Sequence, residues 1–258
     1  MPGQWIADDE TARFNRRSRE VSYSHVFPVA EMQSTASQYF GSMVAEYDSL
    51  IRRAVPRYDE MRERLLEYLP PTAVRVLELG CGTGNLSLAL AGKYPQAKLT
   101  MVDAAPEMLN LTRLRLQESG RLTAEHTFVQ STFEELSLAT GDYDLITSCI
   151  SLHHVQDKAA LYKSLRLSLA PGGYFIFADQ LRGGTERIHE VNWRLWLDFC
   201  RQPGGCSEEE IDSLLQHAEK HDHYTPLAEH FQLLAEAGFR DFDCTWRNLI
   251  WGIVHAAV

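Results

Sequence analysis

The chain has 258 residues, of which 45% are hydrophobic and 23% charged, with a formal net charge of -10 at pH 7. This length and apolar content suffice for a full core without stabilising disulfides. The acidic balance argues against a nucleic-acid partner, because a polyanion needs locally concentrated Lys and Arg. With no long apolar run, no signal-like N-terminus and five scattered cysteines, we expect a cytoplasmic protein with reduced thiols and no membrane partner.

The first 71 residues show a helical pattern in their second half. Apolar residues recur at helical spacing between residues 34 and 69, as at Met61 and Leu65, and Pro56 interrupts the pattern. We therefore expect two or three helices in an N-terminal helical segment, residues 1–71.

From residue 72 onward, short β-branched runs alternate with helical segments. Alternation of this kind predicts βαβ units and a parallel sheet. We assign residues 72–183 to this α/β core. Strands are expected at residues 74–79, 98–103, 127–129, 143–150 and 174–179, and helices at residues 85–93, 106–119 and 161–169.

The stretch from 184 to 225 is mainly helical and is interrupted at Pro203-Gly204-Gly205. It is too long for a simple crossover, so we expect a helical lid. Residues 226–258 should complete the core. There, a helix at 227–237 stops at Gly238, and strands at 242–247 and 249–255 have a connection short enough to predict an antiparallel hairpin.

A glycine-rich segment, Glu78-Leu79-Gly80-Cys81-Gly82-Thr83-Gly84, lies where the first strand gives way to a helix. Parallel sheets bind ligands at this carboxyl edge, and glycine lets the backbone turn tightly and approach a ligand closely. A dinucleotide loop would require glycine at Asn85, and no Gly-Lys-Ser/Thr follows, so a pyrophosphate loop and a P-loop are both disfavoured. Asp103 ends the second strand, where a carboxylate is able to accept hydrogen bonds from both hydroxyls of a ribose.

The segment from Val76 to Gly84 resembles the first motif of the class I S-adenosylmethionine-dependent methyltransferases, and the resemblance extends over about residues 72–179. It implies a Rossmann-like, seven-stranded, mostly parallel sheet whose last strand is antiparallel, with S-adenosyl-L-methionine as the cofactor. The glycines would flank the methionine moiety, Glu78 would orient the loop, and Asp103 would hold the ribose. The cofactor-binding residues expected on this basis are Tyr47, Glu78, Gly80, Cys81, Gly82, Gly84, Asp103, Ala104, Met108, Ser131, Thr132, Phe133 and Ile150.

Two of these expectations leave alternatives open. Many relatives carry an acidic residue after the third strand to accept the adenine amine, whereas this chain has Gln130-Ser131-Thr132-Phe133. Backbone groups or the hydroxyls of Ser131 and Thr132 would have to replace that carboxylate, beside an adenine pocket lined by Ala104 and Met108. The Tyr47 hydroxyl either reaches the methionine carboxylate or belongs to the core.

His153 and His154 follow the fourth strand and are the candidate catalytic residues. An imidazole has an unperturbed pKa near 6.5, which suits removal of a proton from a hydroxyl or an ammonium near neutral pH. The alternative is that the pair only packs against the cofactor. Asp179, at the end of the fifth strand, is either a second acid or base or a cap for the chain that follows, and we favour the cap.

His217, His221 and His223 form the one cluster with metal-ligand character. His217 and His221 are four residues apart on an expected helix and would share a face. The surrounding Glu and Lys residues favour a solvated helix end, so we assign no metal and leave the cluster as a question.

The function that the sequence favours is methyl transfer from S-adenosylmethionine to a small molecule, with the O-, N- or C-acceptor undefined. Tyr47-Asp48 and Ser151-Leu152-His153-His154 also resemble the carboxy-S-adenosylmethionine synthases, so a synthase of that kind or a tRNA-modification enzyme is an alternative. A non-catalytic cofactor-binding subunit is a second alternative. We expect a small-molecule substrate, and a homodimer is compatible with the sequence.

Overall fold

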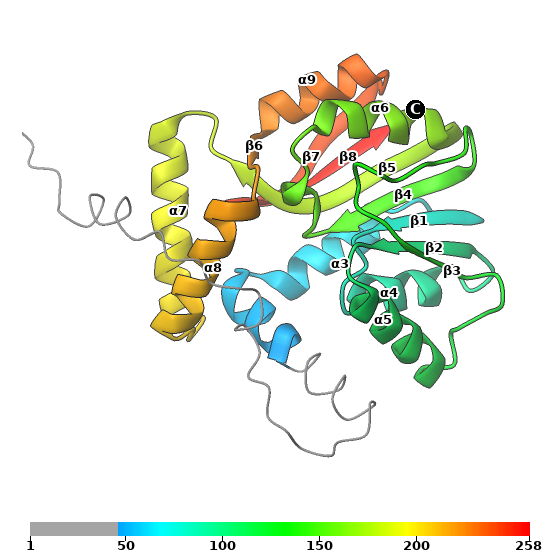
Figure 1. The fold of residues 1–258 in the computed structure, drawn as a ribbon. Helices are drawn as coiled ribbons and strands as arrows, with labels where there is room; N and C mark the ends of the chain where they lie inside the picture. The colour runs from blue at the N-terminus through cyan, green and yellow to red at the C-terminus, as the bar shows by residue number, and fades with distance from the viewer. Residues whose placement is uncertain (1–45) are drawn as a thin grey trace, which may run out of the picture. The chain divides into compact units, whose positions relative to one another are not determined.

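The computed structural model describes residues 46–258, so the helical pattern expected upstream of residue 46 lies outside the described residues. The described chain is a three-layered α/β domain with helices on both faces of a central sheet (Figure 1). Residues 46–54 form a helix, followed by α3 (Tyr58–Tyr68). The break near Pro56 is thus confirmed.

The main sheet has the strand order β3-β2-β1-β4-β5-β8-β7. The first five strands are parallel, whereas β8 is antiparallel to both β5 and β7. The expected Rossmann-like sheet and C-terminal hairpin are therefore confirmed. The strands are β1 (Arg75–Leu79), β2 (Lys98–Asp103), β3 (Thr127–Gln130), β4 (Tyr143–Cys149), β5 (Leu169–Arg182), β7 (Asp241–Asn248) and β8 (Trp251–Ala257).

Helices cover both faces because the central strands are apolar on both sides, which is the pattern of a buried parallel sheet. On one face α3, α4 (Asn85–Lys93) and α5 (Pro106–Glu118) pack on one core cluster, and on the other α6 (Lys158–Ser168) and α9 (Leu227–Ala237) pack on a second (Figure 1). Gly238 ends α9 with a left-handed φ of 97°, as its place after the helical pattern predicted.

Apart from shifts of one to three residues at element ends, as in α6 and β8, three differences from the expected elements concern the sheet. β5 starts at Leu169, ahead of the glycine turn, because Leu169 already pairs with Tyr143 before a register irregularity. A short extra strand, β6 (Thr225–Pro226), pairs with the end of β5. β4 ends at Cys149, since Ile150 has a left-handed φ of 60°.

Two helices, α7 (Glu186–Arg201) and α8 (Glu208–His221), fill the stretch expected to be a lid. Side-chain hydrogen bonds connect α7 and α8 to the helix at residues 46–54. The Trp196 indole donates a hydrogen bond to the Ala54 carbonyl at 2.7 Å, and the Arg53 guanidinium donates to both Glu210 carboxylate oxygens at 2.6 Å each. The N-terminal helix and the two later helices therefore form one connected cover.

We expect Glu210→Gln to weaken this connection. The substitution removes the charge that Arg53 pairs with but keeps an acceptor for the Ser207 amide that caps α8. Because the pair is about one-third exposed, the loss should be about 1 kcal/mol or less, which lowers the melting temperature by roughly 2–4 °C at this chain size. Scanning fluorimetry at low salt measures it. Glu209→Gln is the matched control, and equal melting temperatures for the two variants would contradict the connection.

Candidate active site

The three glycines of the loop after β1 have different surroundings, although all have positive φ. A Cβ on Gly80 would collide with the Ser151 side chain, and a Cβ on Gly84 would lie 2.8 Å from the Thr112 hydroxyl. A Cβ on Gly82 would meet nothing within 4 Å. Gly80 and Gly84 are therefore required by packing within the protein, whereas Gly82 presents bare backbone to open space.

Asp103 fixes the open part of this loop. Its Oδ2 accepts a hydrogen bond from the Gly82 amide at 2.8 Å, and its Oδ1 accepts one from the Ala105 amide at 3.0 Å. Each carboxylate oxygen keeps a free acceptor position, since one oxygen has room for about two hydrogen bonds. Asp103 therefore holds the loop and still has capacity for ligand hydroxyls.

Glu78, in β1, is buried below the loop with one partner. Its Oε2 accepts a hydrogen bond from the Ser87 hydroxyl at 2.5 Å, while its Oε1 is buried without a hydrogen-bond partner. Burial raises the pKa of Glu78 to about 8, with an added contribution from Asp103 and an opposing one from the Ser87 hydrogen bond. Within the described part of the chain, no basic side chain pairs with Glu78 or Asp103.

The helix at residues 46–54 is tied directly to the glycine loop by Asp48. The Asp48 Oδ1 atom accepts hydrogen bonds from the Thr83 hydroxyl at 3.1 Å and the Asn85 side-chain amide at 2.7 Å. Burial together with the nearby Cys149, Asp48 and Asp103 raises the pKa of the adjacent Tyr47 to about 12. Tyr47 is therefore near enough to Asp103 for the two groups to interact electrostatically, and its place in the cofactor site stays a prediction.

The residues expected around an adenine lie beside Asp103. The Ser131 amide donates to the Asp103 carbonyl at 3.1 Å, which joins the ends of β2 and β3. The Ser131 hydroxyl donates to the Thr132 carbonyl and the Thr132 hydroxyl accepts from Glu135, so both hydroxyls have local partners. The other expected positions in this region are Ala104, which is exposed, and Met108 and Phe133, which are half-buried, with Phe133 facing Gly80.

The chain leaves β4 through a strained turn directly beside the glycine loop. Ile150 is β-branched and has φ of 60°, a conformation that side chains of this shape rarely adopt. The next residue, Ser151, donates its hydroxyl to the Leu79 carbonyl at 3.0 Å and fills the space above Gly80. Strained backbone of this kind is concentrated at functional sites. Here it precedes a turn in which the His153 side chain is buried and the His154 side chain is exposed.

His153 and Asp179 form a buried pair at this edge of the sheet. The His153 Nδ1 atom lies 2.5 Å from Asp179 Oδ1, while Asp179 Oδ2 accepts from the Ser151, Leu152 and His153 amides at 3.2, 2.6 and 3.2 Å. Burial acts to lower the pKa of His153, but the Asp179 carboxylate outweighs it and raises that pKa. Asp179 therefore caps the turn after β4, and not only the chain that follows it, where its Oδ1 accepts the Gln180 amide at 2.7 Å; it also contacts the His153 ring.

Asp222, after α8, brings a second carboxylate to the same place. Its side chain is 3% exposed, and its Oδ1 lies 3.8 Å from His153 Nε2, 3.1 Å from His154 Nδ1 and 3.8 Å from His217 Nε2. Its Oδ2 accepts the Tyr224 hydroxyl at 2.5 Å. Although burial acts to raise the pKa of Asp222, the histidines and Tyr224 hold it at about 2.

Backbone hydrogen bonds fix Asp222 in this position independently of its side chain. The His223 amide donates to the His153 carbonyl at 2.6 Å. The Lys158 ammonium donates to the Val155 and His223 carbonyls at 2.7 Å each. The segment after α8 is therefore hydrogen-bonded to the turn after β4 that carries His153 and His154.

Several residues of this site were not predicted as site residues from the sequence. Asp222, Tyr224 and the connecting role of Asp48 carried no sequence signal of their own. Of the histidines that were singled out, the structure places His153, His154 and His217 around Asp222, whereas the His223 side chain is exposed. The His221 ring packs beside the His217 ring at 5.1 Å.

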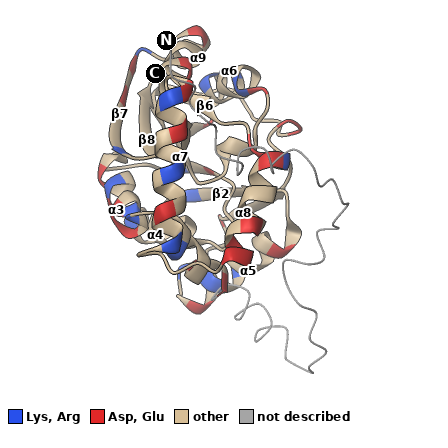
Figure 2. Cartoon of the chain, turned by 90° about the vertical axis from the view of Figure 1, so that its left-hand side faces the viewer, with Lys and Arg blue, Asp and Glu red and all other residues tan. Residues whose placement is uncertain are grey.

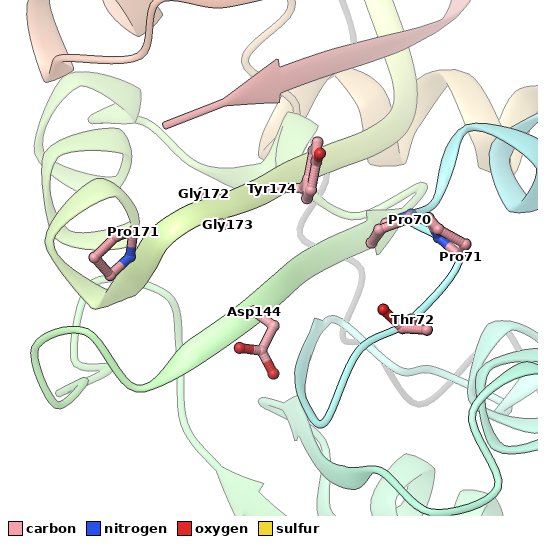
Figure 3. Close-up of a pocket in the computed structure, with 8 residues that line it drawn as sticks. All are labelled: Pro70, Pro71, Thr72, Asp144, Pro171, Gly172, Gly173 and Tyr174. Atoms are coloured by element: carbon pink, nitrogen blue, oxygen red, sulfur yellow. The ribbon is translucent and has the colours of Figure 1, made fainter.

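The pocket shown in Figure 3 is separate from this site. It has a volume of about 310 Å³ and lies at the amino ends of the strands, opposite the glycine loop (Figure 3). The carboxylate of Asp144, its one acidic lining residue, already accepts the Val74 and Arg75 amides at 2.9 and 2.8 Å. We therefore place the chemistry at the carboxyl edge, where polar groups converge.

Comparison with known proteins shows the class of enzyme to which the chain is similar. Residues 76–173 match the family model for a methyltransferase domain. The ubiquinone biosynthesis O-methyltransferase of Xanthomonas axonopodis pv. citri is 37% identical over 42% of this chain. The carboxy-S-adenosyl-L-methionine synthase of Campylobacter lari is 22% identical over 81% of this chain and 89% of its own length.

A solved structure shows the same fold. The phosphoethanolamine N-methyltransferase 2 of Haemonchus contortus, in complex with S-adenosyl-L-methionine, aligns over 86% of this chain and 58% of its own with a TM-score of 0.61 and 16% identity. In residues 76–173 the chain carries a methyltransferase domain similar to those of the class I S-adenosylmethionine-dependent methyltransferases. It spans only 45% of the Xanthomonas relative.

The cofactor of this methyltransferase family is S-adenosylmethionine, and the residues present fit it. The molecule carries a sulfonium and an ammonium against one carboxylate, so its net charge is positive. Glu78 offers a buried oxygen without a partner, Asp103 has spare acceptor capacity, and Gly82 leaves open space beside its backbone. Uncompensated carboxylates and bare backbone suit a cation with ribose hydroxyls.

We expect Gly82→Ala to weaken binding of S-adenosylhomocysteine by about tenfold or more, because a methyl group would occupy the open space beside the loop. Gly120→Ala is the matched control: Gly120 has φ of +67° and equally free surroundings, but lies after α5. Both variants should lose roughly 1–2 kcal/mol of stability to the left-handed conformation. Calorimetric titration should show weak binding in Gly82→Ala alone, and normal affinity there would contradict the assignment of the loop.

Binding of S-adenosylmethionine should release a proton from Glu78. With a pKa of about 8, Glu78 is mostly protonated at pH 7, and a cationic ligand favours its carboxylate. Affinity should therefore rise between pH 6.5 and 7.5, by up to about tenfold per pH unit, and level off above pH 8. The neighbouring Cys81 and Cys149 thiols have raised pKa values and stay protonated throughout.

Calorimetry at pH 7 in two buffers with different ionisation enthalpies counts the released proton. Glu78→Gln, which keeps the shape of the side chain, is the control and should release none. If the wild-type protein also releases none, the ionisation of Glu78 is not coupled to cofactor binding.

Proposed function

We propose that this protein transfers the methyl group of S-adenosylmethionine to a small molecule that binds against the His153–Asp222 cluster. The observation that carries this proposal is that the histidine turn after β4 packs directly on the cofactor loop, with Ser151 above Gly80. The backbone of the glycine loop and the histidine side chains of the turn therefore lie next to each other at the carboxyl edge of the sheet. The cofactor supplies an activated methyl group on its sulfonium, so the protein has mainly to align the acceptor and receive its proton.

His153 is the residue best placed to deal with that proton. Asp179 holds Nδ1, which leaves the Nε2 atom facing Asp222 and the segment after α8. This arrangement fixes both the tautomer and the ring orientation, as a carboxylate does for a histidine base. His154 is 40% exposed and lies on the outer side of the cluster. We assign the catalytic role to His153 and an acceptor-positioning role to His154.

The charges on the helices above the site favour a small acceptor. Along α7, acidic and basic residues alternate, as Figure 2 shows, and α8 has five acidic residues but one lysine. A nucleic-acid substrate would need clustered cations here. We propose that residues 184–225, with the helix at residues 46–54, cover the acceptor during transfer. No helix in the described part of the chain is both long and apolar enough to cross a membrane.

A synthase that modifies the cofactor is the second candidate, favoured by the alignment with the Campylobacter lari synthase over most of both chains. Such an enzyme needs a cation for its carboxylic acid co-substrate. The basic groups near the loop are engaged with carbonyl oxygens, Arg115 with Thr83 and Arg62 with Asn85. Native mass spectrometry of the purified protein separates the two candidates, because a carboxylated cofactor is heavier than S-adenosylmethionine.

We expect His153→Ala to lower turnover by about 10²–10⁴-fold while S-adenosylhomocysteine binds with nearly unchanged affinity. Turnover is measured as formation of S-adenosylhomocysteine with an acceptor selected from a panel of small hydroxylated and amino compounds. His255→Ala, in β8 beside Tyr174, is the control and should retain the wild-type rate. A wild-type rate in His153→Ala would reduce His153 to a packing residue.

A further inference from the structure

We propose that His153, His154 and Asp222 bind a divalent transition-metal ion, with His217 as a fourth ligand. The three donor atoms, one from each of these residues, lie within 4.8 Å of one another. Metal–ligand bonds of about 2.0–2.1 Å place neighbouring ligands roughly 3.0–3.4 Å apart. The distance from Asp222 Oδ1 to His154 Nδ1, 3.1 Å, lies within this range, and the distance to His153 Nε2, 3.8 Å, exceeds it slightly, so small side-chain rotations would suffice.

The carboxylate oxygen at the centre of the cluster independently points to a ligand. Asp222 Oδ1 is buried and has no hydrogen bond, although three imidazole nitrogens surround it. His154 Nδ1 is near enough at 3.1 Å but lies outside hydrogen-bond geometry. A buried, unpaired carboxylate oxygen is costly. A cation between the oxygen and the nitrogens would remove that cost.

The groups behind the ligands are those that metal sites use. A metal-binding histidine commonly donates its other ring nitrogen to a carboxylate, which fixes its orientation. The His153 Nδ1–Asp179 contact at 2.5 Å does this and leaves Nε2 for the metal. The Tyr224 hydroxyl orients Asp222 in the same way, through Oδ2 at 2.5 Å.

The site is also held in place by main-chain bonds. The His223 amide bonds the His153 carbonyl, so the segment carrying Asp222 is fixed to the turn carrying His153 and His154. Lys158 bonds the carbonyls on both sides of this junction. His217 is 45% exposed and lies 3.8 Å from Asp222 Oδ1, so its ring is free to turn toward the ion.

The nature of the donors selects the class of metal. Imidazole nitrogens with one carboxylate suit zinc, iron or cobalt, whereas magnesium and calcium prefer oxygen donors. In methyl transfer, such an ion would lower the pKa of an acceptor hydroxyl, and with the ion bound this replaces proton acceptance by His153, whose Nε2 would then be a ligand. Metal binding stands without the proposed function; this role rests on it.

Zinc uptake tests the site on the full-length protein. The chelator-stripped protein is dialysed against Zn²⁺ and its metal content is measured by mass spectrometry. We expect about one equivalent in the wild type and in His223→Ala, whose side chain is exposed beside Asp222. Asp222→Asn and His154→Ala should lose uptake, and Tyr224→Phe should weaken affinity by about 10–100-fold.

Two further measurements keep the test decisive. Melting temperatures of the stripped proteins show whether Asp222→Asn is folded, and Zn²⁺ should then raise the melting temperature of the wild type and of His223→Ala but not of Asp222→Asn. The visible spectrum with Co²⁺ should show nitrogen and oxygen ligands and no thiolate band. Absence of uptake in the wild type, or equal uptake in folded Asp222→Asn, would overturn the site. Zinc binding without binding of S-adenosylmethionine would support the site and refute the proposed function.

Discussion

The contact between Ser151 and Gly80 is the constraint on which the site depends. The turns that follow β1 and β4 cross so closely that the first has no room for a Cβ, and the Ser151 hydroxyl bonds the Leu79 carbonyl. Because β1 and β4 are neighbours in the parallel sheet, both turns leave the same edge. The loop that fits the cofactor and the turn that carries the histidines are therefore held in fixed positions relative to each other. The turn begins at Ile150, which has a strained left-handed conformation.

Asp179 extends this connection to the next strand. Its carboxylate accepts the Ser151, Leu152 and His153 amides and contacts the His153 ring, so one buried group shapes the turn and sets the orientation of its histidine. The segment after α8 is then bonded to the His153 carbonyl through its own backbone. Three strands and a distant segment thus converge on a small polar cluster, which is the preorganisation that a chemical step requires.

The sequence was informative where local signals decide the structure. β2 and α9 have the predicted bounds, and α9 ends at Gly238 because glycine readily adopts the left-handed conformation needed there. The position of Asp103 beside Gly82 also followed, since adjacent parallel strands end at one edge. The approach of Asp222 to His153 did not follow, because it depends on how α7 and α8 fold back over the sheet. Asp48 likewise bonds the loop through tertiary packing that no periodicity encodes.

The distribution of carboxylates links the fold to its ligands. Glu78 and Asp222 each bury an oxygen without a hydrogen-bond partner, and both lie at the edge where the cofactor and the acceptor are proposed to meet. The pKa of Glu78, raised to about 8 mainly by burial, shows that its carboxylate is disfavoured in the ligand-free protein, whereas the histidines and Tyr224 already stabilise the Asp222 carboxylate. Their presence is explained if cations are bound there, the sulfonium compound near Glu78 and a metal ion near Asp222. Such ligands bind only the folded protein, so their binding free energy adds to its stability and offsets the cost of burying the Glu78 carboxylate.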